Sequence, residues 1–179
     1  MMNRSIQWMV LALFVVAAFT AGVFFKPPDT LAQKKAGALG KQIQGSWILV
    51  SMYNEQDGKK VDVFGPNPKG LWIFTPDGSF SQIITQASLP KFASNNRTKG
   101  TVEENQAVVQ GTYAVFGKYK VASDKEQTVN IHIVGSTFPN FVDQDQKRTI
   151  TVSGDELKVT NPSSTLGGGT NYSVWKRSK

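Results

Sequence analysis

The sequence predicts an all-β domain: an eight-stranded antiparallel up-and-down barrel with one short helix between strands 3 and 4. Short segments rich in β-branched and aromatic residues recur from residue 46 to residue 177. Turn residues such as Pro76-Asp77-Gly78 separate most of these segments, which favours pairing in sequential order. Gly45-Ser46-Trp47 opens the first segment, and a basic residue follows Trp175 in the last one. A cation placed on the face of the Trp47 ring would seal the base of a small barrel.

Eight segments have strand composition, and one segment has a helix signal. The strands are expected at residues 46–53, 70–75, 79–85, 113–121, 128–135, 147–152, 156–160 and 170–177. Thr101 and Glu104 match a capping box, so we expect a helix that Thr101 caps and that ends near Gln110. Eight sequential strands can close around one small ligand. A β-sandwich stays the alternative, because closure is not encoded in strand composition.

The first 32 residues are expected to form a signal peptide or a membrane anchor. Residues 8–25 contain no charged side chain and follow Arg4, and Thr30-Leu31-Ala32 offers a cleavage site. An uncleaved transmembrane helix is the alternative, because the apolar stretch is near the lower limit of roughly 17–25 spanning residues. Both interpretations predict a periplasmic, secreted or outward-facing anchored domain. Residues 33–44 are then expected to be a flexible linker, and residues 45–177 the barrel domain.

Composition excludes several classes of function. The chain has no cysteine and one histidine, so disulfides and a zinc site of the usual composition are excluded. We expect no metal and no cofactor. The net charge is +7, but the lysines are scattered and match no nucleic-acid-binding motif, so we expect no nucleic-acid partner. Membrane contact is expected only through residues 8–25, if they are not cleaved, and the oligomeric state is left open.

Alternation along the strands assigns two titratable side chains to opposite faces. Arg148 shares its face with Ile150, so its guanidinium is a candidate anchor for an anionic ligand group. The interpretation that the sequence favours buries only its aliphatic stem and leaves the charged group in water. His132, the sole imidazole, points away from the Ile131 side of its strand, which indicates a surface or rim position. A polar lumen would reverse this assignment and place His132 in the pocket with Asn130. At the base, either Lys176 or Arg177 is expected to cover Trp47.

From residue 45 to residue 177 the chain resembles the short, single-domain lipocalin-like proteins of bacteria. The segments that carry the resemblance are Gly45-Ser46-Trp47, Phe74-Thr75-Pro76-Asp77-Gly78, Phe92-Ala93-Ser94, Gly117-Lys118-Tyr119 and Phe138-Pro139-Asn140. The resemblance implies a lipocalin-type barrel whose lumen binds small hydrophobic molecules. Some proteins of similar fold are enzymes, but the resemblance transfers no catalytic residue.

Three hypotheses about function follow. The favoured one is an exported protein that binds a small hydrophobic or amphipathic molecule, including an anionic one, with a mouth at residues 86–100. The second is an enzyme of the isomerase or cyclase type, in which His132 or Tyr119 transfers a proton. The third is a ligand-free structural or interaction protein of the cell envelope. The expected ligand contacts are Arg148, Tyr119, Arg97, Phe80, Ile84, Ile131 and Phe138.

Overall fold

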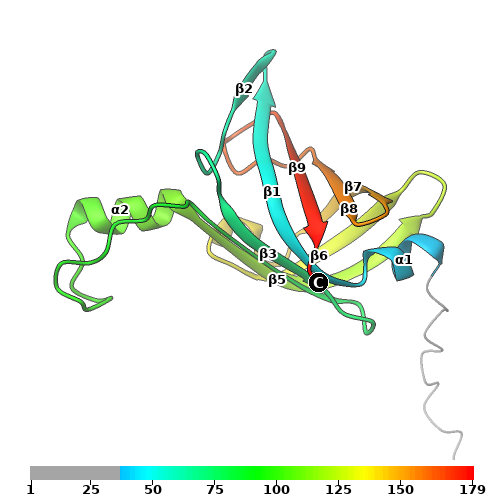
Figure 1. Ribbon diagram of the computed structural model, residues 1–179, viewed down its shortest axis with the longest axis horizontal. Helices are drawn as coiled ribbons and strands as arrows, with labels where there is room; N and C mark the ends of the chain where they lie inside the picture. The colour runs from blue at the N-terminus through cyan, green and yellow to red at the C-terminus, as the bar shows by residue number, and fades with distance from the viewer. Residues whose placement is uncertain (1–36) are drawn as a thin grey trace, which may run out of the picture. The chain divides into compact units, whose positions relative to one another are not determined.

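The computed structural model describes residues 37–179, so the expected signal or anchor at residues 1–32 lies outside the described part (Figure 1). The elements are α1 (Ala38–Ile43), β1 (Gly45–Gln56), β2 (Lys59–Val61), β3 (Lys69–Phe74), β4 (Ser79–Thr85), α2 (Val102–Gly111), β5 (Thr112–Ser123), β6 (Thr128–Ser136), the 3-10 helix η1 (Pro139–Phe141), β7 (Asp145–Ser153), β8 (Glu156–Asn161) and β9 (Thr170–Arg177). None of the helices within residues 37–179 has the length and apolar character needed to cross a bilayer.

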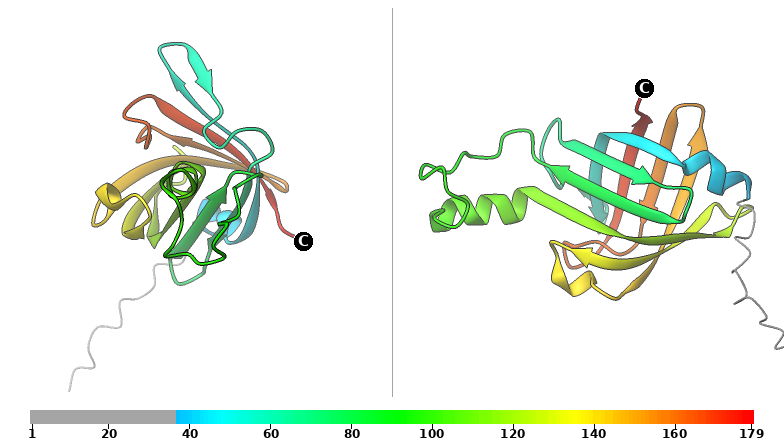
Figure 2. Two further views of the ribbon diagram at one scale, coloured as in Figure 1. Left: turned by 90° about the vertical axis from the view of Figure 1, so that its left-hand side faces the viewer. Right: turned by 90° about the horizontal axis from the view of Figure 1, so that it is seen from below.

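The strands form one antiparallel sheet that closes on itself. From β3 to β9 each strand pairs with the next one in sequence, and β1 pairs with both β3 and β9. The seam between β1 and β9 runs from Trp47 opposite Arg177 to Glu55 opposite Thr170. The ring therefore contains eight strands, and β2 is a hairpin extension of β1 outside it (Figure 2). The predicted eight-stranded barrel is confirmed, and the sandwich alternative is excluded.

Helix α2 lies between the third and fourth strands of the ring, as predicted. The Thr101 hydroxyl accepts a hydrogen bond from the Glu104 amide, and the Glu104 carboxylate accepts one from the Thr101 amide. The Glu104 carboxylate also accepts a bond from the Ala93 amide, which fastens the preceding loop to the helix. Most side chains of α2 are exposed. Figure 2 shows α2 and this loop as an arm that extends away from the barrel.

Helix α1 corrects the expectation of a flexible linker for residues 38–43; residues 33–36 of the expected linker lie outside the described part. Leu39 and Ile43, four residues apart, lie on one face of α1 and are buried in the hydrophobic core. The amide of Leu39 donates a 2.9 Å hydrogen bond to the Asp124 carboxylate after β5. A helix of six residues is not stable by propensity alone. Packing at the end of the barrel therefore stabilises it.

Trp47 closes one end of the barrel, and Arg177 covers it. The guanidinium carbon of Arg177 lies 4.1 Å from the centre of the Trp47 ring. The same guanidinium donates hydrogen bonds to the carbonyl oxygens of Gln44, at 2.9 Å, and Gln42, at 2.8 Å. Lys176 is exposed on the outer face and pairs with Ile48. The structure thus decides between the two basic residues in favour of Arg177.

The aromatic core fills the sealed half of the interior. Trp72 packs against Phe74, with ring centres 4.7 Å apart, and edge-on against Trp175, at 5.3 Å. Tyr119 packs edge-on against Phe74 at 5.1 Å. Because these large side chains lie toward the end that Trp47 closes, the unfilled part of the interior lies toward the opposite end.

Removal of the Arg177 guanidinium should destabilise the barrel. Arg177→Met loses the cation–π contact and two hydrogen bonds to carbonyl oxygens, so we expect a loss of about 2 kcal/mol in the free energy of unfolding. Urea denaturation monitored by tryptophan fluorescence measures this loss. Lys176→Met, one residue earlier on the outer face, is the control and should change stability by less than about 0.5 kcal/mol. Equal effects of the two variants would contradict the role assigned to Arg177.

Candidate functional site: a pocket in the barrel lumen

The open half of the barrel contains a pocket. The pocket has a cavity volume of about 50 Å³, or about 620 Å³ when the open space at its mouth is included. One enclosed water needs roughly 10–15 Å³ of cavity volume, so the pocket has room for a small molecule. Its lining residues are Met52, Val63, Phe64, Trp72, Phe80, Gln82, Tyr113, Val115, Ile131, Ile133, Phe141, Arg148, Val159, Asn161, Ser164, Thr165, Asn171 and Ser173.

Arg148 is the one charged side chain among the described residues that line the pocket. It comes from the inward face of β7 and is 7% exposed. Its guanidinium donates hydrogen bonds to the Gln146 side-chain oxygen and, at 3.2 Å, to the carbonyl oxygen of Lys147. Within residues 37–179 no carboxylate forms an ion pair with it. The charge is therefore held inside the barrel by neutral groups alone.

Burial changes the pKa values of the two titratable groups in the pocket. Desolvation lowers the pKa of Arg148 to about 10, and the nearby Tyr113 hydroxyl opposes part of this shift. Desolvation raises the pKa of Tyr113 above its usual value, and the Arg148 charge opposes this shift. At neutral pH the pocket thus holds a positive guanidinium beside a neutral phenol.

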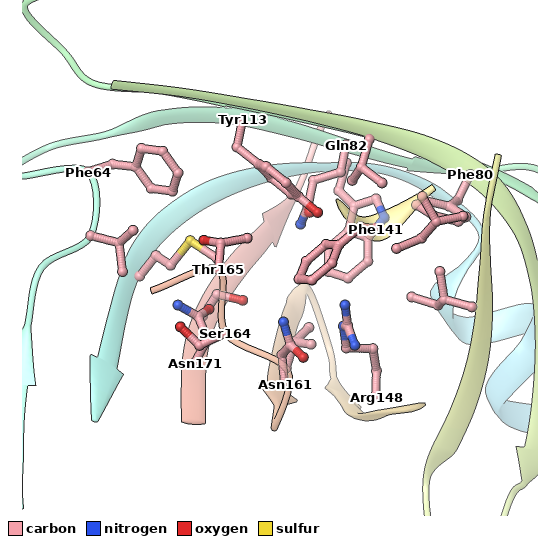
Figure 3. A pocket seen from close by; sticks show the side chains of 18 residues that line it. Phe64, Phe80, Gln82, Tyr113, Phe141, Arg148, Asn161, Ser164, Thr165 and Asn171 are labelled. Atoms are coloured by element: carbon pink, nitrogen blue, oxygen red, sulfur yellow. The ribbon is translucent and has the colours of Figure 1, made fainter. Parts of the chain in front are cut away.

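Polar side chains line two opposite sides of the pocket. Figure 3 shows Arg148, Asn161 and Asn171 on one side, and Gln82 and Tyr113 on the other. The first three come from the neighbouring strands β7, β8 and β9, and the other two come from β4 and β5. A bound molecule would therefore meet hydrogen-bonding side chains on both sides.

Trp72 contributes an unused hydrogen-bond donor. Its side chain lines the pocket and is 2% exposed, and its indole N–H has no hydrogen-bond partner among residues 37–179. Buried donors without a partner are uncommon and costly. An acceptor atom on a bound molecule is one way to satisfy this group.

Three of the expected ligand contacts line the pocket. Arg148, Phe80 and Ile131 do so, each from the inward face of its strand. Ile84 is also inward and fully buried, but it packs into the core outside the pocket lining. Phe138 packs edge-on against Phe141 at 5.0 Å, and Phe141 is the one that lines the pocket.

The other expected site residues lie elsewhere. The Tyr119 hydroxyl donates a 2.8 Å hydrogen bond to the Thr75 carbonyl oxygen near the sealed end. Arg97 is exposed in the loop before α2. His132 lies on the outer face of β6, where its Nδ1 is 2.9 Å from the Asp145 carboxylate. The structure therefore brings neither Tyr119 nor His132, the two candidates for proton transfer, to the pocket.

The expected mouth at residues 86–100 also needs correction. No residue of that segment lines the pocket, because the loop packs on α2 in the projecting arm. The loops that reach the pocket carry Phe64, Phe141, Ser164 and Thr165. Sequence reasoning missed these residues because irregular loops have no alternation. It could have found Gln82, which lies between Phe80 and Ile84 on one strand face.

A family model described as a lipocalin-like domain matches residues 44–178. A lipocalin-like protein from Bacteroides uniformis is 20% identical, with a TM-score of 0.41, and the alignment covers 76% of this chain and 99% of that one. An uncharacterized protein from Bacteroides eggerthii is 16% identical, with a TM-score of 0.39 and coverage of 75% and 98%. The amine binding protein of Rhodnius prolixus, in its tryptamine complex, is 13% identical, with a TM-score of 0.34 and coverage of 76% and 63%. No curated protein sequence matches the chain.

Removal of the buried charge should stabilise the empty barrel. The pKa of Arg148 falls on folding from its ordinary value to about 10, so between these two values the unfolded chain binds more protons than the folded one. Stability therefore rises with pH through this range, and below about 10 the charge costs on the order of 3 kcal/mol. Arg148→Met removes this cost, and the loss of the hydrogen bonds to Gln146 and Lys147 offsets part of the gain.

We expect a net gain of about 1–2 kcal/mol for Arg148→Met, or about 3–8 °C in Tm. Differential scanning calorimetry at pH 7 measures it on protein freed of bound small molecules. Lys147→Met, the exposed neighbour on the outer face, is the control and should leave Tm unchanged. A fall in Tm for Arg148→Met would mean that the guanidinium stabilises the fold.

Proposed function

We propose that this chain, which belongs to the family of lipocalin-like domains, binds a small amphipathic molecule with an anionic group inside its barrel. The observation that carries the proposal is the guanidinium of Arg148, which is buried in the pocket and has no acidic partner among residues 37–179. An unpaired buried charge is expensive. A carboxylate or similar anion would supply the missing counter-charge and accept two parallel hydrogen bonds.

The rest of the pocket favours an apolar body on the same molecule. Phe64, Phe80 and Phe141 contribute aromatic surface, and Ile131 and Ile133 contribute aliphatic surface. Apolar walls with a few placed polar groups are the usual form of a small-molecule site. The ligand is therefore an amphipathic anion, with the acidic group at Arg148 and the apolar part against these rings.

A binding role accounts for the polar groups better than turnover does. His132 is outside the barrel and the Tyr119 hydroxyl is engaged with a main-chain carbonyl, so neither is placed to move a proton in the lumen. Tyr113 and the Trp72 indole N–H are hydrogen-bond donors at neutral pH, and so is Arg148. Three donors around one pocket suit recognition of an anion.

Export is part of the proposal. The uncharged segment at residues 8–25 after Arg4 has the pattern of a signal peptide or anchor. A chain delivered by such a segment would work in the periplasm or outside the cell, as a carrier or scavenger of its ligand. Protease protection of the chain in intact cells, compared with cells opened by osmotic shock, measures the compartment.

A matched pair of probes tests the role of Arg148. 1-Naphthylacetate and 1-naphthylacetamide share an aromatic body and differ in charge. The wild-type protein should bind the acid roughly 10–100-fold more tightly than the amide by isothermal titration calorimetry, because a hydrogen bond to a charged group contributes about 1.5–3 kcal/mol. Arg148→Met should abolish this preference and leave amide binding intact, whereas Lys147→Met should retain it. Equal affinity of the wild-type protein for both probes would overturn the anionic site.

Binding of the acid should depend on pH with a defined sign. The carboxylate is ionised throughout the range above pH 6, and the pKa of Arg148 is about 10. Acid affinity should therefore be level from pH 6 to pH 9 and fall about tenfold for each pH unit above about 10. The amide should show no such fall while the protein stays folded. A decline of acid binding near pH 7 would place the essential charge on a different group.

A further inference from the structure

One wall of the barrel is apolar on its outer face. Ile48 of β1 pairs directly with Leu71 of β3, Leu71 with Ile83 of β4, and Ile83 with Ala114 of β5, so the four side chains form a continuous row. Ile48 is 45% exposed and Ile83 is 50% exposed. We define the apolar wall as this row with its exposed neighbours Val50 and Phe116.

The outer face of β7 and β8, two strands that pair with each other, provides an internal comparison. Its residues are Asp145, Lys147, Thr149, Thr151, Glu156, Lys158 and Thr160. Neither of these two strands contains an exposed large hydrophobic residue. An antiparallel strand with one solvated face normally alternates apolar and polar residues, as β7 and β8 do. In the apolar wall, by contrast, adjacent strands carry exposed apolar residues on their outer faces. This indicates that something other than water covers the wall.

Lysines border the apolar wall. Lys176 is the direct partner of Ile48 on β9. Lys69 precedes Leu71 by two residues on β3, and Lys118 follows Phe116 by two residues on β5, so both share the outer face. Strands β3, β4 and β5 contain no acidic residue. The carboxylates beside these lysines are Asp77 in the β3–β4 turn, 3.5 Å from the Lys118 ammonium, and Glu156 of β8, the direct strand partner of Lys176.

We propose that the apolar wall docks the barrel onto the surface of a bilayer that contains anionic lipids. Apolar side chains at the headgroup boundary, flanked by lysines, are the usual elements of interfacial membrane binding. A second copy of this chain is less suitable, because a two-fold contact would bring the lysine borders of both copies together. The net charge of +7 adds attraction to an anionic surface.

The sequence before the barrel supplies an independent argument that the apolar wall contacts a membrane. Residues 8–25 are the uncharged apolar segment of the predicted signal or anchor, and eleven residues, 26–36, separate this segment from the described domain. Even fully extended, eleven residues reach at most about 40 Å. An uncleaved anchor would therefore keep the barrel within reach of the membrane surface, where a weak docking face is sufficient. The docking proposal does not depend on what the lumen binds.

The absence of cysteine from the chain permits a direct test. Nitroxide labels are attached through Ser81→Cys, on the apolar wall between the Leu71 row and Lys118, or through Thr151→Cys, on the outer face of β7. The full-length chain is reconstituted in vesicles of phosphatidylcholine with 30% phosphatidylglycerol, or of phosphatidylcholine alone. We expect the Ser81→Cys label to lose access severalfold to a water-soluble paramagnetic reagent in the anionic vesicles. The Thr151→Cys label should stay accessible in both.

Charge variants distinguish docking of the apolar wall on anionic lipid from mere attachment of the barrel through an N-terminal anchor. Lys69→Gln, Lys118→Gln and Lys176→Gln are combined in one chain, and Lys125→Gln, Lys147→Gln and Lys158→Gln in a control chain with the same net charge. In the first chain the ratio of docked to undocked protein should fall roughly fivefold for each lysine. The control chain should keep most of the protection at Ser81→Cys. Near-UV circular dichroism verifies that both chains retain the barrel.

Three results would overturn the proposal. The first is equal accessibility of the two labels in both vesicle types. The second is the same loss of access in vesicles without anionic lipid, with no effect of the lysine variants. The third is protection of Ser81→Cys in detergent, without vesicles, that grows with protein concentration, which would assign the apolar wall to a second copy of the chain.

Discussion

The structure depends on the two-sided pairing of β1. Its first residues pair with β3 from Gly45 to Ile48, and its residues from Trp47 to Glu55 pair with β9. The strand therefore joins the start of the ring to its end, and a register shift between Leu49 and Ser51 bends it along the seam. Once the ring is closed, every strand has a defined inner face, and the size of the interior is set by the eight strands.

The interior of the barrel has two parts, one filled by side chains and one left partly empty. Trp47, Trp72 and Trp175 fill the end that Arg177 covers, and this aromatic cluster supplies the burial that stabilises the fold. The other end is left partly empty and holds Arg148, which weakens the empty barrel through its desolvated charge. A stable half thus supports a half whose polar groups suit a bound molecule better than they suit the fold.

Sequence alternation predicted which face a side chain occupies but not its height in the barrel. It placed Arg148 on the same face as Ile150, and Arg148 lines the pocket. Tyr119 was also an expected ligand contact, yet it lies near the sealed end, because height depends on the register with neighbouring strands. The mouth was expected in the longest loop. That loop binds Glu104 of its own helix and projects outward, while the shorter loops with Phe64 and Phe141 reach the pocket. Helix α1 was missed because its stability comes from tertiary burial of Leu39.

Strands β3 and β4 carry apolar residues on both of their faces. Leu71, Trp72, Ile73 and Phe74 follow one another without a polar residue, and Ile83-Ile84 repeats the pattern on the paired strand. Runs of this kind are typical of strands that are covered on both sides. The inner side is covered by the core and borders the pocket, whereas the outer side is bare in the isolated domain. Because the two faces of one strand are set by alternate residues, an outer contact can be changed without altering the inner one. The two faces thus allow the same strands to form a pocket wall and a membrane contact.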